Sequence, residues 1–370
     1  MRQKTRRAVA HLSVFGFILS LLLYLNRPQS NKPFAWTTIR YKSHASTAPE
    51  APGICPGLAR ISKPALVVSR VAADGDLTWL NALADLYHLC VYTADVPPDA
   101  KSKFLQVPAN RGHEAMGYLT FLIDNYENIP KSGVVFVHGS RFAWHNDDPS
   151  YDNAALLAML NVPAALAPSG YHNLRCDWSA STCLPSSAPQ GSLETSLMSI
   201  LQPWDDRVAS DNALPGALAA LFGGDDSTQT SGRLQLGRTE VVRSQCCAQF
   251  VVARDNIWQH SQEEYAALRQ WLLDGIVHGR GHKNAAPPDD IVAGRILSYI
   301  WHILFLKEAK SDSLDLRHLN SLACPRADEC YCRLYGRCNL EYCTSPGSCR
   351  GQYEIPKGFR LPANWATDHS

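Results

Sequence analysis

The 370-residue chain lacks the signatures of several common protein classes. It has no Gly-x-Ser-x-Gly elbow, no P-loop and no His-Glu-x-x-His pair, which argues against α/β-hydrolases, P-loop NTPases and zincin proteases. It contains no Cys-x-x-Cys pair, which argues against a zinc knuckle. An Asn-x-Ser/Thr sequon is also missing, so N-glycosylation gives no evidence on the compartment.

The chain also lacks any marked excess of charge. Its formal net charge is +1, and four basic residues stand within the first seven positions. The remainder is therefore close to neutral and shows no basic stripe, so we expect no nucleic-acid partner. A hydrophobic content of 45% with 19% charged residues is typical of a globular protein.

One long apolar run stands near the start of the chain. Residues 8 to 25 are just long enough to cross the hydrocarbon core as a helix. The basic flank places residues 1 to 7 in the cytosol and the rest across the membrane. We expect a type II signal anchor, followed by a flexible stalk over residues 26 to 63. The alternative is a cleaved signal peptide, although residues 26 to 29 offer no small-x-small cleavage site.

The twelve cysteines favour an oxidising compartment. Six of them lie close together near the C-terminus and predict a disulfide-rich module over residues 320 to 355: Cys324, Cys330, Cys332, Cys338, Cys343 and Cys349. Cys176 and Cys183 bracket a short polar loop and are expected to pair. The adjacent Cys246 and Cys247 are expected to join two separate disulfides rather than form a redox centre.

Short apolar runs alternate with helical patterns over residues 64 to 310. This alternation predicts an α/β domain, a mostly parallel, Rossmann-like sheet flanked by helices. The expected strands are residues 65–70, 88–93, 133–138 and 247–254. The expected helices are residues 77–86, 110–126, 261–273 and 291–306.

A polar cluster follows the third expected strand. It contains His138, Arg141, His145, Asp147 and Asp148. Ligands of open α/β sheets bind beyond the carboxyl ends of the strands, and imidazole with carboxylate suits a divalent cation such as Mn²⁺ or Mg²⁺. We therefore predict that the two histidines and two aspartates hold a metal and that Arg141 binds substrate. The alternative is a polar loop whose aspartate caps the next helix.

Two further groups are candidates for substrate binding. Arg70 ends the first expected strand and Asp74 follows it, where a carboxylate could hold a ribose hydroxyl, although Asp-Gly is also a common turn. Arg111, His113 and Glu114 open the second expected helix, where backbone N–H groups favour a phosphate. The alternative for Glu114 is an ordinary acidic residue in a first helical turn.

The last long helix is apolar on almost every side and should be buried. Arg295, Ser298 and His302 nevertheless recur on one of its faces. These three are our catalytic candidates, with His302 as the base. The alternative is a helix that exposes one narrow face to solvent.

Several of these motifs together resemble an uncharacterised fungal family built on a domain of unknown function. The motifs are Val107-Pro-Ala-Asn-Arg-Gly-His-Glu-Ala-Met116, Phe142-Ala-Trp-His-Asn-Asp-Asp148, Tyr171-His-Asn-Leu-Arg-Cys176 and Cys246-Cys-Ala-Gln-Phe-Val-Val-Ala-Arg254. The likeness spans residues 64 to 355. The family pattern has a glutamate in the last helix where this chain has Ser298, which puts catalysis through that position in doubt.

A weaker likeness concerns residues 249 to 254, which are similar to an element of Golgi glycosyltransferases with the GT-A fold. The resemblance implies a lumenal enzyme of the Golgi or endoplasmic reticulum that takes a sugar nucleotide and a glycan acceptor, with Arg254 in the substrate site. His145, Asp147 and Asp148 would then bind the cation that stabilises the leaving diphosphate. The alternative is a non-catalytic glycan- or protein-binding protein with a degenerate transferase fold.

Overall fold

The computed structural model describes residues 3–25, 38–41, 53–96, 102, 104–223, 241–275, 284–306, 316–343 and 345–353. Helix α1 (Gln3–Leu25) contains an 18-residue window, Arg6–Leu23, with mean hydropathy 1.5 and no buried residue. The helix is therefore long and apolar enough to cross a membrane, as the sequence predicts.

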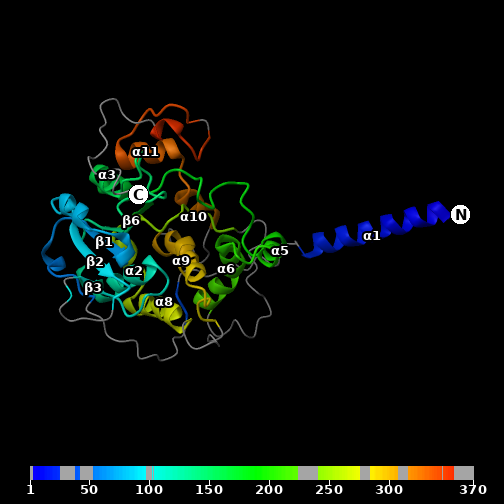
Figure 1. Cartoon of the computed structure of the whole chain (residues 1–370), viewed down its shortest axis with the longest axis horizontal. Coiled ribbons are helices and arrows are strands. Elements are labelled where there is room, and N and C mark those ends of the chain that lie inside the picture. Colours follow the sequence, from blue (N-terminus) through cyan, green and yellow to red (C-terminus); the bar gives the residue numbers. More distant parts are fainter. Residues whose placement is uncertain are drawn as a thin grey trace.

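Six strands form one sheet in the order β3-β2-β1-β4-β6-β5. The strands are β1 (Ala65–Arg70), β2 (His88–Thr93), β3 (Leu105–Gln106), β4 (Val134–His138), β5 (Tyr171–Asn173) and β6 (Phe250–Val252). Strands β1 to β4 are parallel, which confirms three of the predicted strands and their direction. Figure 1 shows this parallel half of the sheet with helices around it.

The sheet is mixed, because β6 runs antiparallel to both β4 and β5 while the other three pairings are parallel, as predicted. The chain approaches β6 along the carboxyl end of β4, where Gln249 accepts a hydrogen bond from the backbone N–H of His138 at 3.4 Å. A strand that starts at this edge must run back across the sheet in the opposite direction. The fourth predicted strand is therefore present but shorter and reversed.

Helices cover both faces of the sheet. The side chains of β4 alternate between two cores: Val134 and Phe136 point to one, Val135 and Val137 to the other. The first core includes helices α2 (Glu114–Asp124), α6 (Asp206–Phe222), α8 (Gln262–Asp274), α9 (Asp290–Phe305) and α10 (Leu316–Ala323). The second includes α3 (Asn153–Met159), α4 (Val162–Leu166) and α11 (Ala327–Tyr335). Two further short helices are α5 (Leu193–Leu201), labelled in Figure 1, and α7 (Arg254–Ile257).

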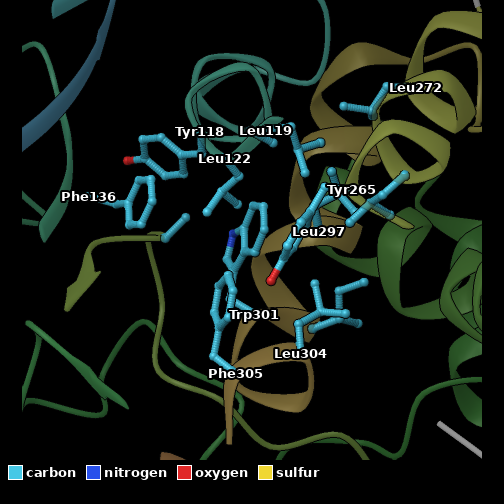
Figure 2. Packing of buried hydrophobic residues seen from close by; sticks show 14 of the residues in the cluster. Tyr118, Leu119, Leu122, Phe136, Tyr265, Leu272, Leu297, Trp301, Leu304 and Phe305 are labelled. Atoms are coloured by element: carbon cyan, nitrogen blue, oxygen red, sulfur yellow. The ribbon is translucent and has the colours of Figure 1, made fainter. Parts of the chain in front are cut away.

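Helix α9 lies in the middle of the larger core, as its apolar composition predicts. Trp301 and Phe305 stack at 5.9 Å between ring centroids, and Trp301 lies 6.1 Å from Tyr118 of α2 (Figure 2). Both α9 aromatic rings also pack on Phe250 of β6. This aromatic contact joins α2, α9 and the sheet and so fixes the helix N-termini relative to the strand ends.

Ordered structure begins earlier than the predicted stalk allows. The backbone N–H of Ile39 donates to Glu264 at 2.7 Å, and the Tyr41 hydroxyl donates to Asp274 at 2.6 Å, both on α8. Cys55 forms a disulfide with Cys90 of β2. The prediction of a flexible stalk is wrong for these residues, and the stalk residues 26–37 and 42–52 lie outside the described part of the chain.

The cysteines connect in a way that the sequence could not give. Cys176 pairs with Cys330 and Cys183 with Cys324, so the predicted Cys176–Cys183 pair is wrong. Both residues reach instead to the C-terminal segment, whose α11 packs its buried face on the second core. The disulfide-rich C-terminal region is therefore fastened to the α/β domain. Only Cys332–Cys338 and Cys343–Cys349 lie within it, among the described cysteines.

Candidate functional site

A cavity of about 230 Å³ lies at the carboxyl end of β4. Its walls come from the start of α2, the loop after β4, the segments at residues 180–182 and 244–247, α6 and α9. The polar, aromatic and disulfide-bonded side chains that line it include His113, Glu114, His138, Trp144, His145, Arg207, Cys246, Cys247, Arg295 and Ser298. The position matches the carboxyl-edge site that open α/β sheets provide.

A carboxylate and an imidazole face each other in this cavity. Glu114 Oε2 lies 3.9 Å from Nδ1 of His138, and only 12% of the Glu114 side chain is exposed. The other ring nitrogen of His138, Nε2, lies 2.5 Å from the carbonyl oxygen of Cys247. A carbonyl only accepts hydrogen bonds, so Nε2 carries the proton in the neutral ring. Nδ1 then carries the free lone pair and is the ring nitrogen nearer to Glu114.

The partner of His138 belongs to a disulfide between adjacent residues. Cys246 and Cys247 are joined to each other, so the prediction of two separate disulfides is wrong. Cys247 and the following Ala248 have φ angles of 84° and 47°, a region that L-residues seldom adopt. This unusual backbone turns the Cys247 carbonyl toward the imidazole.

Positive charge gathers on another wall of the cavity. Arg207 of α6 and Arg295 of α9 both line it, and Nε of Arg295 is buried with no hydrogen-bond partner in the described structure. Asp211 lies near both arginines and near Arg243. Burial raises the pKa of Asp211, while Tyr299 and the three guanidinium groups act in the opposite direction. Arg243 does not line the cavity, so Arg207 and Arg295 supply the positive charge that faces it, and Asp211 offsets part of that charge.

An aromatic pair completes the wall beside His138. The ring of His145 lies 4.7 Å from that of His138, and Trp144 contacts His145 edge-on at 5.6 Å. Burial, with the charges of His138 and Arg175, lowers the pKa of His145 to about 3, so this imidazole stays neutral. Trp144 is 66% exposed and offers a flat surface at the cavity.

The structure therefore brings together six of the fourteen predicted site residues. They are His113, Glu114, His138, His145, Arg295 and Ser298. The Ser298 hydroxyl donates to the Arg295 carbonyl at 2.7 Å, an interaction within the helix. His113 is half exposed, with Nε2 at 3.5 Å from Asp290.

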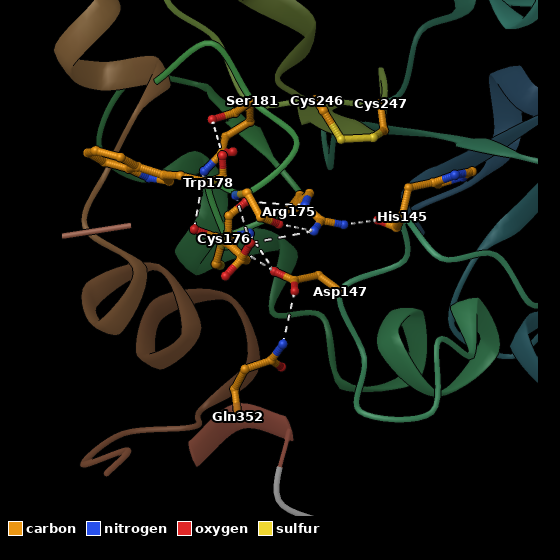
Figure 3. A network of polar contacts seen from close by, with 12 residues as sticks. His145, Asp147, Arg175, Cys176, Trp178, Ser181, Cys246, Cys247 and Gln352 are labelled. Atoms are coloured by element: carbon orange, nitrogen blue, oxygen red, sulfur yellow. Dashed lines mark hydrogen bonds and ion pairs between the residues drawn. A yellow bond between two sulfur atoms is a disulfide. The ribbon is translucent and has the colours of Figure 1, made fainter. Parts of the chain in front are cut away.

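Asp147 lies outside the cavity and is fully engaged within the protein. One of its oxygens accepts from the backbone N–H groups of Cys176 and Asp177, at 2.6 and 3.1 Å. The other accepts from Tyr331 at 2.8 Å and Gln352 at 3.2 Å. Figure 3 shows this carboxylate between the 174–177 segment and the C-terminal region. Its geometry is that of a structural tie between the α/β core and the C-terminal segment, in place of the predicted metal ligand.

The other two charged residues of that loop also have internal partners. Asp148 accepts from the backbone N–H and the hydroxyl of Ser150, at 2.9 and 2.6 Å. Arg141 forms a two-pronged pair with Asp152, the N-cap of α3, at 3.1 and 2.9 Å. The predicted cation ligands His138, His145, Asp147 and Asp148 do not converge. The described residues contain a single group of three close donors, Cys55, His88 and Cys90, and its cysteines form a disulfide.

The residues after β1 form a turn instead of a ligand pocket. Asp74 accepts from the backbone N–H of Val71 at 2.8 Å and from Ser140 at 2.5 Å. Arg70 donates to the Val71 carbonyl at 3.0 Å. A side chain at Gly139 would meet Arg70 and Asp74 at under 3 Å, so the ends of β1 and β4 approach closely because residue 139 is glycine.

The predicted phosphate site at the start of α2 is filled by a protein carboxylate. Asp290 accepts from Nη1 of Arg111 at 2.9 Å and from the backbone N–H of Gly112 at 2.6 Å. Arg111 is buried and also donates to the carbonyls of Leu272 and Pro287. It therefore joins α2, α8 and the start of α9.

Two further candidates lie away from the cavity. His302 is buried within α9, and burial lowers its pKa to about 4, so it is a neutral core histidine rather than a base. His302 stands two turns further along α9 than Arg295. The helix face that lines the cavity at Arg295 has entered the core by His302. Arg254 pairs with Asp255 at 3.3 Å and stacks 4.4 Å from the ring of Trp258.

Three features of the cavity were not predicted. Arg207 lies in a region with little sequence pattern, and its role depends on how α6 packs beside α9. Trp144 stands within one of the family motifs, but its exposure was not foreseeable. The Cys246–Cys247 disulfide had a sequence signal, the two adjacent cysteines. A disulfide between neighbours requires an unusual backbone, which the sequence did not indicate.

Comparison with known families assigns the domain that carries this cavity. A family model described as "Protein of unknown function (DUF3431)" matches residues 66–333. The chain belongs to the DUF3431 family. This confirms membership of a family of unknown function, close to the limits that the motifs predict. No curated protein and no solved structure matches the chain. The whole cavity lies within the DUF3431 domain.

Proposed function

We propose that this DUF3431 protein is a membrane-anchored glycosyltransferase-like enzyme that uses a sugar nucleotide in the lumen of the Golgi or endoplasmic reticulum. The observation that carries the proposal is that Glu114 with His138, and Arg207 with Arg295, line one cavity at the carboxyl edge of the sheet. Glycosyl transfer needs both elements, a base for the acceptor hydroxyl and positive charge for the leaving diphosphate.

The sheet topology supports a nucleotide donor. The strand order β3-β2-β1-β4 matches the first half of the Rossmann order, and the direction in which successive strands are added to the sheet reverses between β1 and β4, which run parallel. Ligands bind at such switch points, and His138 ends β4. The cavity is smaller than the usual range of about 300–1,000 Å³ for ligand sites, so it would enclose the sugar and diphosphate and leave the nucleoside outside.

In the proposed reaction Glu114 removes the proton from the acceptor hydroxyl as its oxygen bonds to the anomeric carbon. The bond between that carbon and the diphosphate oxygen breaks, and the diphosphate leaves with the electron pair. Arg207 and Arg295 bind the charge that develops on the leaving group. The unprotonated Nδ1 of His138, 3.9 Å from Glu114, would then take this proton from the carboxyl group through a bridging water. Glu114 thus replaces His302 as our candidate base.

The anchor and the disulfides support the compartment. The apolar part of helix α1 follows a basic flank that favours a cytosolic N-terminus, and all described cysteines are paired, which suits an oxidising lumen. A cation is not required by this arrangement, because two guanidinium groups could bind the diphosphate. Sugar-nucleotide binding should therefore be measured both with and without Mn²⁺ or Mg²⁺.

A second candidate function is non-catalytic glycan binding. The resemblance of the motifs implies a glutamate where this chain has Ser298, whose hydroxyl is bonded within the helix. The exposed Trp144 could stack on a sugar ring without any reaction. In this case free oligosaccharides, rather than sugar nucleotides, would bind.

The test is a thermal-shift panel on the full chain in lipid nanodiscs. Sugar nucleotides with uracil, guanine and cytosine bases are added with and without Mn²⁺, beside free oligosaccharides. We expect at least one sugar nucleotide to raise the melting temperature and Arg295→Gln to remove the shift. A shift with oligosaccharides alone supports the second function, and no shift with any sugar nucleotide contradicts the first.

A further inference from the structure

Helix α5 presents its apolar side outward. Leu193, Leu197, Ile200 and Leu201 recur at the spacing of one helix face, and all four are exposed. Ile200 is 75% exposed, and Trp204, just beyond the helix, is 77% exposed. A contiguous group of large apolar side chains on a surface marks a contact site.

The polar side of the same helix faces the protein. Thr195 is only 4% exposed, and the Ser196 hydroxyl donates to Asn212 of α6 at 3.0 Å. An ordinary surface helix buries its apolar face, so α5 is turned the opposite way. The described part of the protein therefore leaves this apolar face uncovered.

The membrane anchor is attached close to this helix. The segment at residues 38–41 lies against α6, where the backbone N–H of Arg40 donates to the Leu221 carbonyl at 2.7 Å. Twelve residues, 26 to 37, separate this segment from the end of α1 and span at most about 45 Å. Leu221 lies nine residues along α6 from Asn212, or about 14 Å. The tether thus ties the α5–α6 side of the domain near the bilayer.

We propose that the exposed face of α5, with Trp204, lies in the interfacial layer of the bilayer that α1 spans. An indole ring favours this layer, because one edge is apolar and the N–H meets water. Residues 193 to 204 contain no lysine or arginine, so the contact depends on apolar burial and not on anionic lipid. The inference rests on the proposed anchorage and not on catalysis.

This contact would set the orientation of the domain. Arg207 follows Trp204 by three residues and lines the cavity. A docked α5 therefore places the cavity beside the membrane surface, where membrane-bound acceptors could reach it. Figure 1 shows α5 and the β2–β3 edge on opposite sides of the domain, so that edge would point away from the bilayer.

Site-specific photocrosslinking of the full chain in phosphatidylcholine vesicles tests the proposal. A benzophenone amino acid replaces Ile200, with Leu19 of α1 as the membrane control. The third site is Leu86, a 48% exposed leucine beside the start of β2, as the matched surface control. We expect Ile200 to give at least about tenfold more lipid adduct than Leu86, as a face inserted among headgroups requires. Lipids brominated on the acyl chain should quench the tryptophan fluorescence of the wild type, and this quenching should be smaller in Trp204→Phe.

Each other outcome overturns the inference in a recognisable way. Lipid adducts at Leu19 with Ile200 no higher than Leu86 would show an anchored chain whose α5 stays off the membrane. Dimeric adducts at Ile200 in place of lipid adducts would identify a second copy of the chain as the partner. Absence of lipid adducts at Leu19 would overturn the anchorage itself, while sugar-nucleotide binding could still be measured separately.

Discussion

Glu114 and His138 lie 3.9 Å apart, carboxylate oxygen to Nδ1, at the meeting point of a helix start and a strand end. The helix α2 and the strand β4 are held together by the aromatic core that includes Tyr118 and Phe136. This core fixes both side chains before any ligand binds. The separation is too long for a direct hydrogen bond, so proton exchange between the carboxylate and the imidazole would use one bridging water.

Replacing Glu114 by glutamine should abolish turnover without preventing donor binding. Glutamine keeps the shape of the side chain but cannot accept the proton, so the rate of donor consumption should fall by about 100-fold or more. The donor Kd should change by less than about threefold, a loss too small for a direct ligand contact. Glu263→Gln, the same change in the first turn of α8, is the matched control. Full activity in Glu114→Gln would exclude it as the base.

The Cys246–Cys247 disulfide should control the ring of His138. Changing both residues to serine frees the backbone that directs the Cys247 carbonyl to Nε2, so the ring should lose its fixed tautomer. Nitrogen-15 NMR of the histidine rings measures this, and turnover should fall by about tenfold or more, since orientation is lost but both groups remain. Cys332→Ser with Cys338→Ser removes a disulfide away from the cavity and should change neither signal. An unchanged His138 spectrum in the first variant would refute the link.

The two disulfides that fasten the C-terminal region should together contribute far more to stability than Cys332–Cys338. Cys176–Cys330 and Cys183–Cys324 are nested and close loops of 154 and 141 residues, whereas Cys332–Cys338 closes a loop of six. Because either long link alone keeps the chain closed, both must be removed, and loop-closure entropy then predicts a loss of at least about 5 kcal/mol, against about 2 kcal/mol for the short loop. Urea unfolding of the four-alanine and two-alanine variants compares the losses. Equal losses would mean that the C-terminal region folds independently of the α/β domain.

Three buried histidines should make the protein unstable in mild acid. Burial lowers the pKa of His145 to about 3 and the pKa values of His172 and His302 to about 4. Their stabilising effect is complete above the unfolded value near 6.5 and is lost as the pH falls toward 4, because the unfolded chain binds protons that the folded chain does not. The free energy of unfolding should fall by up to about 4 kcal/mol per pH unit in this range.

His302→Leu should remove about one third of that slope, since one of three protons is no longer taken up. Ser298→Ala, a non-titrating change on the same helix, should leave the slope as in the wild type. Urea unfolding at pH 7, 6 and 5 gives the slopes. A wild-type slope in His302→Leu would show that this histidine does not contribute.

The sequence predicted the parts of the fold that depend on local pattern. Apolar runs located β1, β2 and β4, and the near-continuous apolar surface of α9 indicated its burial. It also singled out His138 at a strand end and Glu114 at a helix start, but as members of two separate groups, and it did not indicate that the two would meet. The direction of β6 could not be predicted, because it depends on the path of the chain from residue 241 to residue 249.

The sequence could not tell which polar residues face a cavity. Asp147 and His145 stand two positions apart in one loop, yet Asp147 turns inward to Tyr331 and His145 lines the cavity. The partners of Asp147 come from residues 176, 177, 331 and 352, too far along the chain for a local motif to reveal them. Arg207 was missed because it reaches the cavity only through the packing of α6 against α9, which no local motif reveals.

Donor binding to the full chain in nanodiscs tests the central claim most directly. Calorimetric titration of the sugar nucleotide that gives the largest thermal shift should yield saturable one-to-one binding. Arg295→Gln should weaken that binding by about tenfold or more, as expected for the loss of one charged hydrogen-bond donor, about 1.5–3 kcal/mol. Arg254→Gln, which changes an arginine stacked on Trp258 outside the cavity, should bind as the wild type does. Equal binding by wild type and Arg295→Gln would contradict the assignment of this cavity.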